Sequence, residues 1–146
     1  MMLLAIDPGT TESGWCVFDG ARVIDSGVES NALLVKNLHL LQHNTLAIEM
    51  VASYGMAVGK EVFETVRWIG RFQQAWREPD AVRLIYRRDV KMLLCGSARA
   101  KDANIRQALI DKLGPVGLKK TPGPLYGVKS HAWSALAVAV TAWETK

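Results

Sequence analysis

A carboxylate ends the first apolar segment of the chain. Asp7 closes the run that begins at Met2, and Gly9 and Gly14 follow it closely. A buried carboxylate is unfavourable unless a cation or strong hydrogen bonds accompany it. The glycines allow a sharp turn into the next strand. The pattern therefore favours a functional acid at a strand end, and the alternative is an ordinary turn aspartate.

A second acid interrupts another apolar segment. Glu49 lies within Thr45–Val51, between alanine, isoleucine, methionine and valine. Strands that are covered on both faces are apolar along their length, so a lone glutamate there has no route to solvent. The pattern favours a second buried carboxylate. The alternative is an edge strand that presents Glu49 to water.

The third polar group lies in the last predicted helix, Ser130–Trp143. His131 and Ser134 are three residues apart and so share a helix face, while their neighbours are apolar. Imidazole binds metals and exchanges protons near neutral pH. A histidine at a helix start or with its hydrogen bonds satisfied in a core is the alternative.

The elements that must position these residues follow from hydrophobic periodicity. A three-stranded meander opens the chain, and strands then alternate with helices, which predicts an α/β sheet flanked by helices in one domain over residues 1–146. The predicted strands are Met2–Asp7, Gly14–Asp19, Arg22–Val28, Thr45–Val51 and Ala81–Tyr86. The predicted helices are Ala32–Leu41, Val58–Trp76, Arg88–Leu94, Lys101–Leu113 and Ser130–Trp143.

Positive charge is concentrated in one part of the chain. The formal net charge is +4, and the segment Arg83–Lys120 holds ten Lys and Arg but only three Asp. The remainder has more acidic than basic residues. A basic block of this kind favours a polyanionic partner, and a solvated surface is the alternative.

The sequence gives no indication of a membrane or secreted protein. No apolar run reaches the roughly 20 residues of a spanning helix. The first residues lack the basic region of a signal peptide. Cys16 and Cys95 form no metal or redox motif. We expect a cytoplasmic protein with reduced thiols.

These features together resemble the RuvC family of Holliday-junction resolvases and the RuvC-like domains of CRISPR effector nucleases. The resemblance is carried by IDPGTTESG, the glutamate of the fourth strand and the polar pair before ALAVAV, and it is nearest to phage-encoded members. It implies an RNase H-like fold with a mixed five-stranded sheet. It also implies a homodimeric nuclease that cleaves branched DNA in a bacterium or a phage-infected cell.

In this family two divalent metals, Mg²⁺ or Mn²⁺, are bound by four side chains. Asp7 and Glu49 match the first two positions, and His131 matches the histidine form of the third. The fourth position is an aspartate in the family pattern, whereas this chain has Ser134. A neutral hydroxyl is a weaker ligand for a hard cation than a carboxylate. A natural variant that uses water, an engineered inactivation and a weakened nuclease all fit this departure.

The resemblance also implies DNA contacts. VKMLLCGSARAK is similar to the family segment whose lysines contact the phosphate region that is cut, with Lys91 and Lys101 as matches, although the loop is one residue shorter. The family aromatic that stacks on an unpaired base falls at Ala52, so Tyr54 is the candidate substitute. Additional phosphate contacts are expected from Arg87, Arg88 and Arg99.

Three other interpretations remain open at this point. The first is a junction-binding protein that has lost catalysis through Ser134. The second is a related nuclease that acts on RNA. The third is a phosphate-loop ATPase of the actin and sugar-kinase type, which needs two such domains where this length supplies one. Trp68, on the flank of its helix, is expected to pack in the core, and a dimer interface is the alternative.

Overall fold

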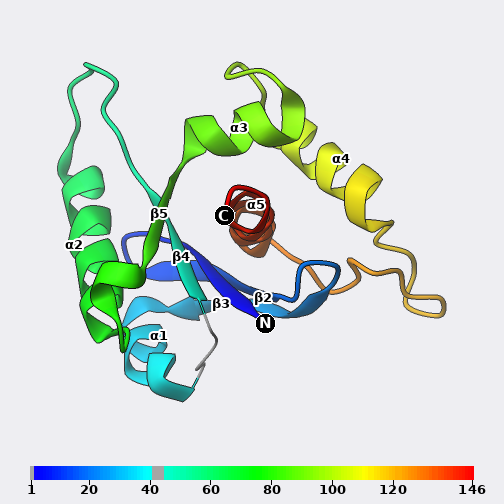
Figure 1. The fold of residues 1–146 in the computed structure, drawn as a ribbon, viewed down its shortest axis with the longest axis horizontal. Coiled ribbons are helices and arrows are strands. Elements are labelled where there is room, and N and C mark those ends of the chain that lie inside the picture. Colours follow the sequence, from blue (N-terminus) through cyan, green and yellow to red (C-terminus); the bar gives the residue numbers. More distant parts are fainter. Residues whose placement is uncertain (1, 41–44) are drawn as a thin grey trace.

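A five-stranded mixed sheet forms the centre of the computed structural model, which describes residues 2–40 and 45–146 (Figure 1). The strands are β1 (Leu3–Asp7), β2 (Glu12–Phe18), β3 (Val23–Ser30), β4 (Thr45–Met50) and β5 (Arg83–Tyr86). Their order in the sheet is β3-β2-β1-β4-β5. The first three strands pair antiparallel, and β4 runs parallel to both β1 and β5.

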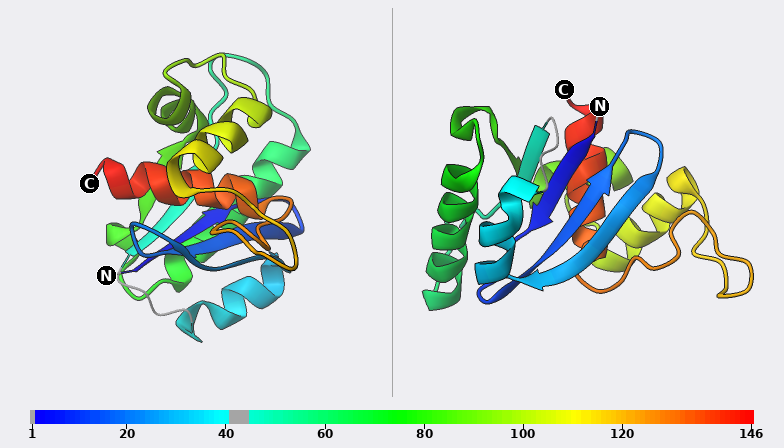
Figure 2. Two further views of the ribbon diagram at one scale, coloured as in Figure 1. Left: turned by 90° about the vertical axis from the view of Figure 1, so that its right-hand side faces the viewer. Right: turned by 90° about the horizontal axis from the view of Figure 1, so that it is seen from below.

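Helices cover both faces of the sheet. The helices are α1 (Asn31–Asn37), η1 (Leu38–Leu40), α2 (Lys60–Ala75), η2 (Pro79–Ala81), α3 (Arg87–Cys95), α4 (Asp102–Leu113) and α5 (Ala132–Glu144). One face packs on α1 and α2, and the other packs on α5. Figures 1 and 2 show α3 and α4 beyond α5, so that α5 lies between them and the sheet.

Alternation along the strands divides the apolar side chains between two cores. Leu4 and Ile6 of β1 face α1 and α2, whereas Leu3 and Ala5 face α5. Successive side chains of a strand point to opposite faces. Asp7 therefore belongs to the α5 face of the sheet.

Helix α5 is buried for most of its length. Its residues from Ala135 to Ala142 are at most 1% exposed. A helix that is apolar all round is stable only where other elements enclose it. The predicted burial of this helix is confirmed.

The predicted α/β architecture is confirmed, with shifts at several element ends. The predicted strand Ala81–Tyr86 was too long, because Pro79 starts a short 3₁₀ turn and pairing begins only at Arg83. The predicted helix Ala32–Leu41 ends as an α-helix at Asn37. Its last residue, Leu41, lies outside the described residues.

Helix α2 is amphipathic, but its buried face differs slightly from the expected one. Thr65, Ile69 and Phe72 are buried, while Val62 and Val66 are only half-buried. Trp68 is half-buried against Phe72, at 6.0 Å between ring centroids, which agrees with core packing. Among the described residues, no helix is long and apolar enough to cross a membrane.

Gly14 has a different role from the one expected. Sequence reasoning placed it at the turn into the second strand, as the first residue of that strand; it lies within β2, where the strand passes the start of α5. A Cβ at this position would lie 2.3 Å from the carbonyl oxygen of His131. The glycine therefore permits close contact between β2 and the backbone that carries His131.

We predict that Gly14→Ala destabilises the protein by about 3 kcal/mol, because a methyl group has no space against a backbone carbonyl. Urea unfolding measures the effect. Gly70→Ala is the matched control, since nothing lies within 4 Å of a Cβ there. Replacing a helical glycine should stabilise the protein by about 0.5–1 kcal/mol. If Gly14→Ala leaves the free energy of unfolding unchanged, the close approach of β2 to the His131 carbonyl is contradicted.

Candidate metal and nucleic-acid site

Asp7 and Glu49 lie next to each other at the ends of adjacent parallel strands. The register pairs Ile6 with Ile48, so the acids are the next residues of β1 and β4 and point to the same face. Their side chains are 13% and 15% exposed. Because β4 lies between β1 and β5, the alternative of an edge strand for Glu49 is excluded.

The environment disfavours two charges at this position. Burial raises the pKa of Glu49 to about 7, and the neighbouring charge of Asp7 adds to the increase. Burial also raises the pKa of Asp7, although His131 and Arg87 counteract it. Buried carboxyls that repel each other stay ionised more readily when a cation is near. The site is therefore suited to bind positive charge.

His131 reaches this pair from the start of α5. Its Nδ1 lies 3.3 Å from Oδ2 of Asp7, and the imidazole is 60% exposed. Ser134, one turn later, lines a cavity of about 430 Å³ together with His131. The structure thus brings Asp7, Glu49 and His131 together, and Ser134 faces the same space.

Arg87 is the cationic partner of Glu49. It is the first residue of α3, directly after β5, and its Nη1 lies 3.5 Å from Oε1 of Glu49. Its Nη2 binds the carboxylate of Asp102 at the start of α4. One guanidinium therefore joins carboxylates from β4 and α4. Sequence reasoning expected a phosphate contact from Arg87 and did not single out Asp102.

The donor atoms suit a divalent metal ion, but they do not already form a complete set. Two buried carboxyl groups and an imidazole are ligands that Mg²⁺ or Mn²⁺ accepts. Within the described residues, however, no three His, Cys, Asp or Glu side chains are arranged to hold a metal. The carboxyls of Asp7 and Glu49 instead face His131 and Arg87.

A buried polar network holds the loop that follows Asp7. The Ser13 hydroxyl donates to Oδ1 of Asn31, and Nδ2 of Asn31 donates to the Gly9 carbonyl at 2.9 Å. The Gly9 amide donates to Oγ of Ser13 at 3.2 Å. Ser13 and Asn31 are at most 1% exposed. Sequence reasoning missed this network, because Ser13 of β2 and Asn31 of α1 are far apart in sequence and meet only in the folded chain.

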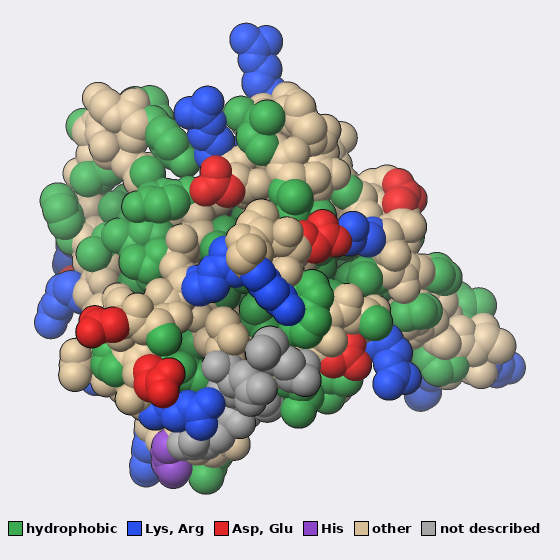
Figure 3. Space-filling model, viewed as in Figure 1, with side chains coloured by type: hydrophobic (Ala, Val, Ile, Leu, Met, Phe, Trp, Pro, Cys, Tyr) green, Lys and Arg blue, Asp and Glu red, His purple; other side chains and the backbone are tan. Residues whose placement is uncertain are grey.

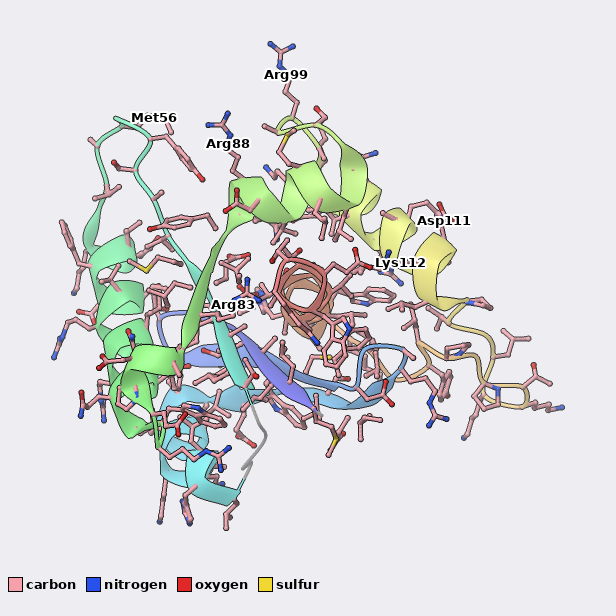
Figure 4. All side chains as sticks on the ribbon, viewed as in Figure 1. Met56, Arg83, Arg88, Arg99, Asp111 and Lys112 are labelled. Atoms are coloured by element: carbon pink, nitrogen blue, oxygen red, sulfur yellow. The ribbon has the colours of Figure 1, made fainter. Side chains whose placement is uncertain are left out.

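A basic groove lies beside the acidic pair. It has a volume of about 340 Å³ and is lined by Tyr54, Arg87, Arg88, Lys91 and Ala98. Tyr54 is 57% exposed, on the loop after β4. In Figure 4, Arg88 on α3 and Arg99 on the following loop point away from the body, at the same end as Met56. Arg87 also lines the cavity of about 430 Å³ that His131 and Ser134 face, so it lies between that cavity and the basic groove.

Arg99 and Lys101 are exposed but do not line this groove. Lys101 directly precedes α4 and so lies beside Asp102 in sequence. Basic side chains are dispersed over the face seen in Figure 3 rather than forming one continuous patch.

Several residues of the basic block serve the fold. Arg83 donates to the carbonyl of Ala142 at the end of α5, and Lys112 pairs with Glu144 at 2.5 Å. The Arg106 guanidinium lies 4.4 Å from the ring centre of Trp133. Fewer basic side chains of this block are therefore available to bind a polyanion than the sequence count suggests.

No protein-family model matches the chain, and no curated protein matches its sequence. Among solved structures it resembles RuvC of Thermus thermophilus, with 24% sequence identity and a TM-score of 0.71 over 99% of this chain and 95% of the other. A structure of T. thermophilus RuvC with a Holliday junction substrate gives 25% identity and a TM-score of 0.71, over 99% and 94% of the two chains. The chain therefore has a RuvC-like fold, as the sequence resemblance implied.

We predict that Glu49→Gln stabilises the metal-free protein in a pH-dependent manner. Because the pKa of Glu49 is raised to about 7, the native state holds this proton up to about pH 7, whereas the unfolded chain releases it near the ordinary glutamate pKa of 4.5. The native state therefore binds more protons than the unfolded chain between pH 4.5 and pH 7, so the free energy of unfolding falls as pH rises through this range. In EDTA, the gain should be small at pH 5 and on the order of 3 kcal/mol at pH 8.

Urea unfolding at both pH values measures this difference. Glu12→Gln, at an exposed position of β2, is the control and should change stability little at either pH. If Glu49→Gln raises the free energy of unfolding equally at pH 5 and pH 8, the raised pKa of Glu49 is contradicted.

Proposed function

We propose that this protein is a metal-dependent endonuclease that resolves four-way junctions and other branched DNA. The observation that carries the proposal is the pair of buried carboxyls, Asp7 and Glu49, with His131 beside them in a chain that has a RuvC-like fold. T. thermophilus RuvC has been solved with a Holliday junction substrate, which supports branched DNA as the ligand. We place the activity in the cytoplasm of a bacterium or a phage-infected cell.

Asp7, Glu49 and His131 would hold two divalent ions, Mg²⁺ or Mn²⁺. When bound, such ions activate a water molecule and stabilise the leaving oxygen of a phosphodiester. The burial of both carboxyls keeps bulk water away from the pair and strengthens its interaction with a cation.

His131 has a second role in this proposal. Its Nδ1 lies beside the Asp7 carboxylate, so a proton on Nδ1 leaves Nε2 as the free acceptor. Because the imidazole is 60% exposed at the cavity, Nε2 is placed to accept a proton from an attacking water or to bind an ion. The contact with Asp7 orients the ring for either task.

The basic groove beside the acidic pair would hold the DNA backbone. Arg88 and Lys91 line it, and Lys101 and Arg99 lie on the connected loop, where they would contact further phosphates. Tyr54 has an exposed ring at the same groove and would stack on an unpaired base near the branch point. Phosphates position the DNA, and an unpaired base distinguishes a branch from a linear duplex.

We also propose that the protein acts as a homodimer. Two symmetric strands of a junction require two sites related by a two-fold axis. Helix α2 presents an exposed aromatic residue, Phe63, on its outer side, at 61% exposure. Aromatic side chains of this kind are enriched at protein interfaces, so α2 is the candidate contact. Trp68 is less suited, since it packs against Phe72 and Arg71.

We predict that the chain cleaves labelled four-way junctions and Y-forks in Mg²⁺ or Mn²⁺ in preference to linear duplex. Asp7→Asn and Glu49→Gln should each reduce the cleavage rate at least about a hundredfold, since each removes a charged ligand. Both variants should still bind junctions in EDTA, as measured by gel mobility. Junction binding without cleavage in either ion would contradict the nuclease proposal and indicate a junction-binding protein.

We predict that junction binding is salt-sensitive and depends on Lys91 and Lys101. Each alanine substitution should reduce the slope of log K against log salt by about one unit, because one phosphate contact is lost. Lys36→Ala is the control, since Lys36 is exposed on α1, on the opposite face of the sheet. Unchanged slopes in both variants would show that the DNA lies elsewhere.

A further inference from the structure

The proposed metal site lacks one carboxylate on α5, where Ser134 supplies only a hydroxyl. Ser134 lines the cavity of about 430 Å³ at the start of α5. A site for hard cations gains most from charged oxygen ligands. An acid on another element would serve equally well if its side chain faced the same cavity.

Asp102 is such an acid. It is the first residue of α4 and lines the cavity together with His131 and Ser134. Its side chain is 86% exposed, so its carboxylate is accessible to a ligand in that space. Its position is fixed by the packing of α4, whose residues Ile105 and Leu109 are buried in the α5-side core.

The Arg87 guanidinium provides an independent indication. It binds Asp102 through Nη2 and Glu49 through Nη1, so two carboxylates from different elements already share one cationic group. The charge of Asp102 also acts on the buried pair, since it raises the pKa of both Asp7 and Glu49.

We propose that Asp102 supplies the metal-binding carboxylate that Ser134 does not, so that the site is completed from α4 instead of α5. This inference rests on the proposed function. Ser134 is then a permitted residue and not a defect, and the chain is a competent nuclease as it stands.

Arg87 lies between Glu49 and Asp102 and contacts both carboxylates. A divalent ion held by Glu49 and Asp102 would replace the guanidinium as their cationic partner, because it carries a greater charge. Arg87 also lines the basic groove with Arg88 and Lys91. Arg87 would then be able to reach a phosphate of DNA bound in this groove, so that metal binding and DNA binding would favour each other.

The test measures Mn²⁺ binding to the DNA-free protein, using the electron paramagnetic resonance signal of the free ion. We expect Asp102→Asn to weaken Mn²⁺ affinity at least about tenfold, and Glu49→Gln to do the same. Asp111→Asn is the matched control on the same helix, because Asp111 is exposed and accepts a hydrogen bond from Gln107 away from the cavity. It should bind Mn²⁺ like the unmodified chain.

The double variant Asp102→Asn with Ser134→Asp makes the test specific. Restoring a carboxylate on α5 should return both Mn²⁺ affinity and junction cleavage to near the unmodified values, while Ser134→Asp alone should gain little. Thermal unfolding of each variant confirms that it folds.

The outcomes separate the inference from the proposed function. If Glu49→Gln weakens Mn²⁺ binding but Asp102→Asn does not, the role of Asp102 is overturned and the metal site remains. If Asp102→Asn weakens binding and Ser134→Asp fails to restore it, Asp102 does not replace the missing position. If neither Glu49→Gln nor Asp102→Asn changes binding, the metal site itself is wrong.

Discussion

The proximity of two buried carboxyl groups is the constraint on which the rest of this structure depends. Parallel pairing of β1 with β4 places Asp7 and Glu49 side by side on the face that α5 covers. Burial and mutual repulsion both disfavour their ionised forms. Each surrounding element contributes to offset this cost: α5 supplies His131, and α3 supplies Arg87. The Asp7 carboxylate thus faces an imidazole, and the Glu49 carboxylate faces a guanidinium.

Much of the fold and part of the site were predictable from sequence, because they follow from local pattern. Apolar segments ending in or containing an acid identified Asp7 and Glu49 on buried strands. The uniformly apolar last helix indicated its own burial, and this placed His131 near the sheet. Periodicity carries this information because it reports which face of an element is covered.

The remaining site features depend on packing that no local pattern encodes. The role of Gly14 follows from the close passage of β2 by His131, which is a contact between distant segments. Arg87 and Asp102 are fifteen residues apart and meet only because α3 and α4 turn back on each other. Sequence reasoning predicted a phosphate contact for Arg87 and did not single out Asp102. The Ser13–Asn31 network was hidden for the same reason.

The burial of α5 has a consequence for the order in which the protein is made. This helix follows every strand in the chain, yet it covers one face of the sheet, and His131 directly precedes it. Until α5 has left the ribosome, that face has no cover and Asp7 has no imidazole partner. Domains generally fold as units during synthesis, and partly made ones expose apolar surface. A nascent chain of this protein therefore exposes an apolar face of its sheet, and Asp7 and His131 come together only when α5 is in place.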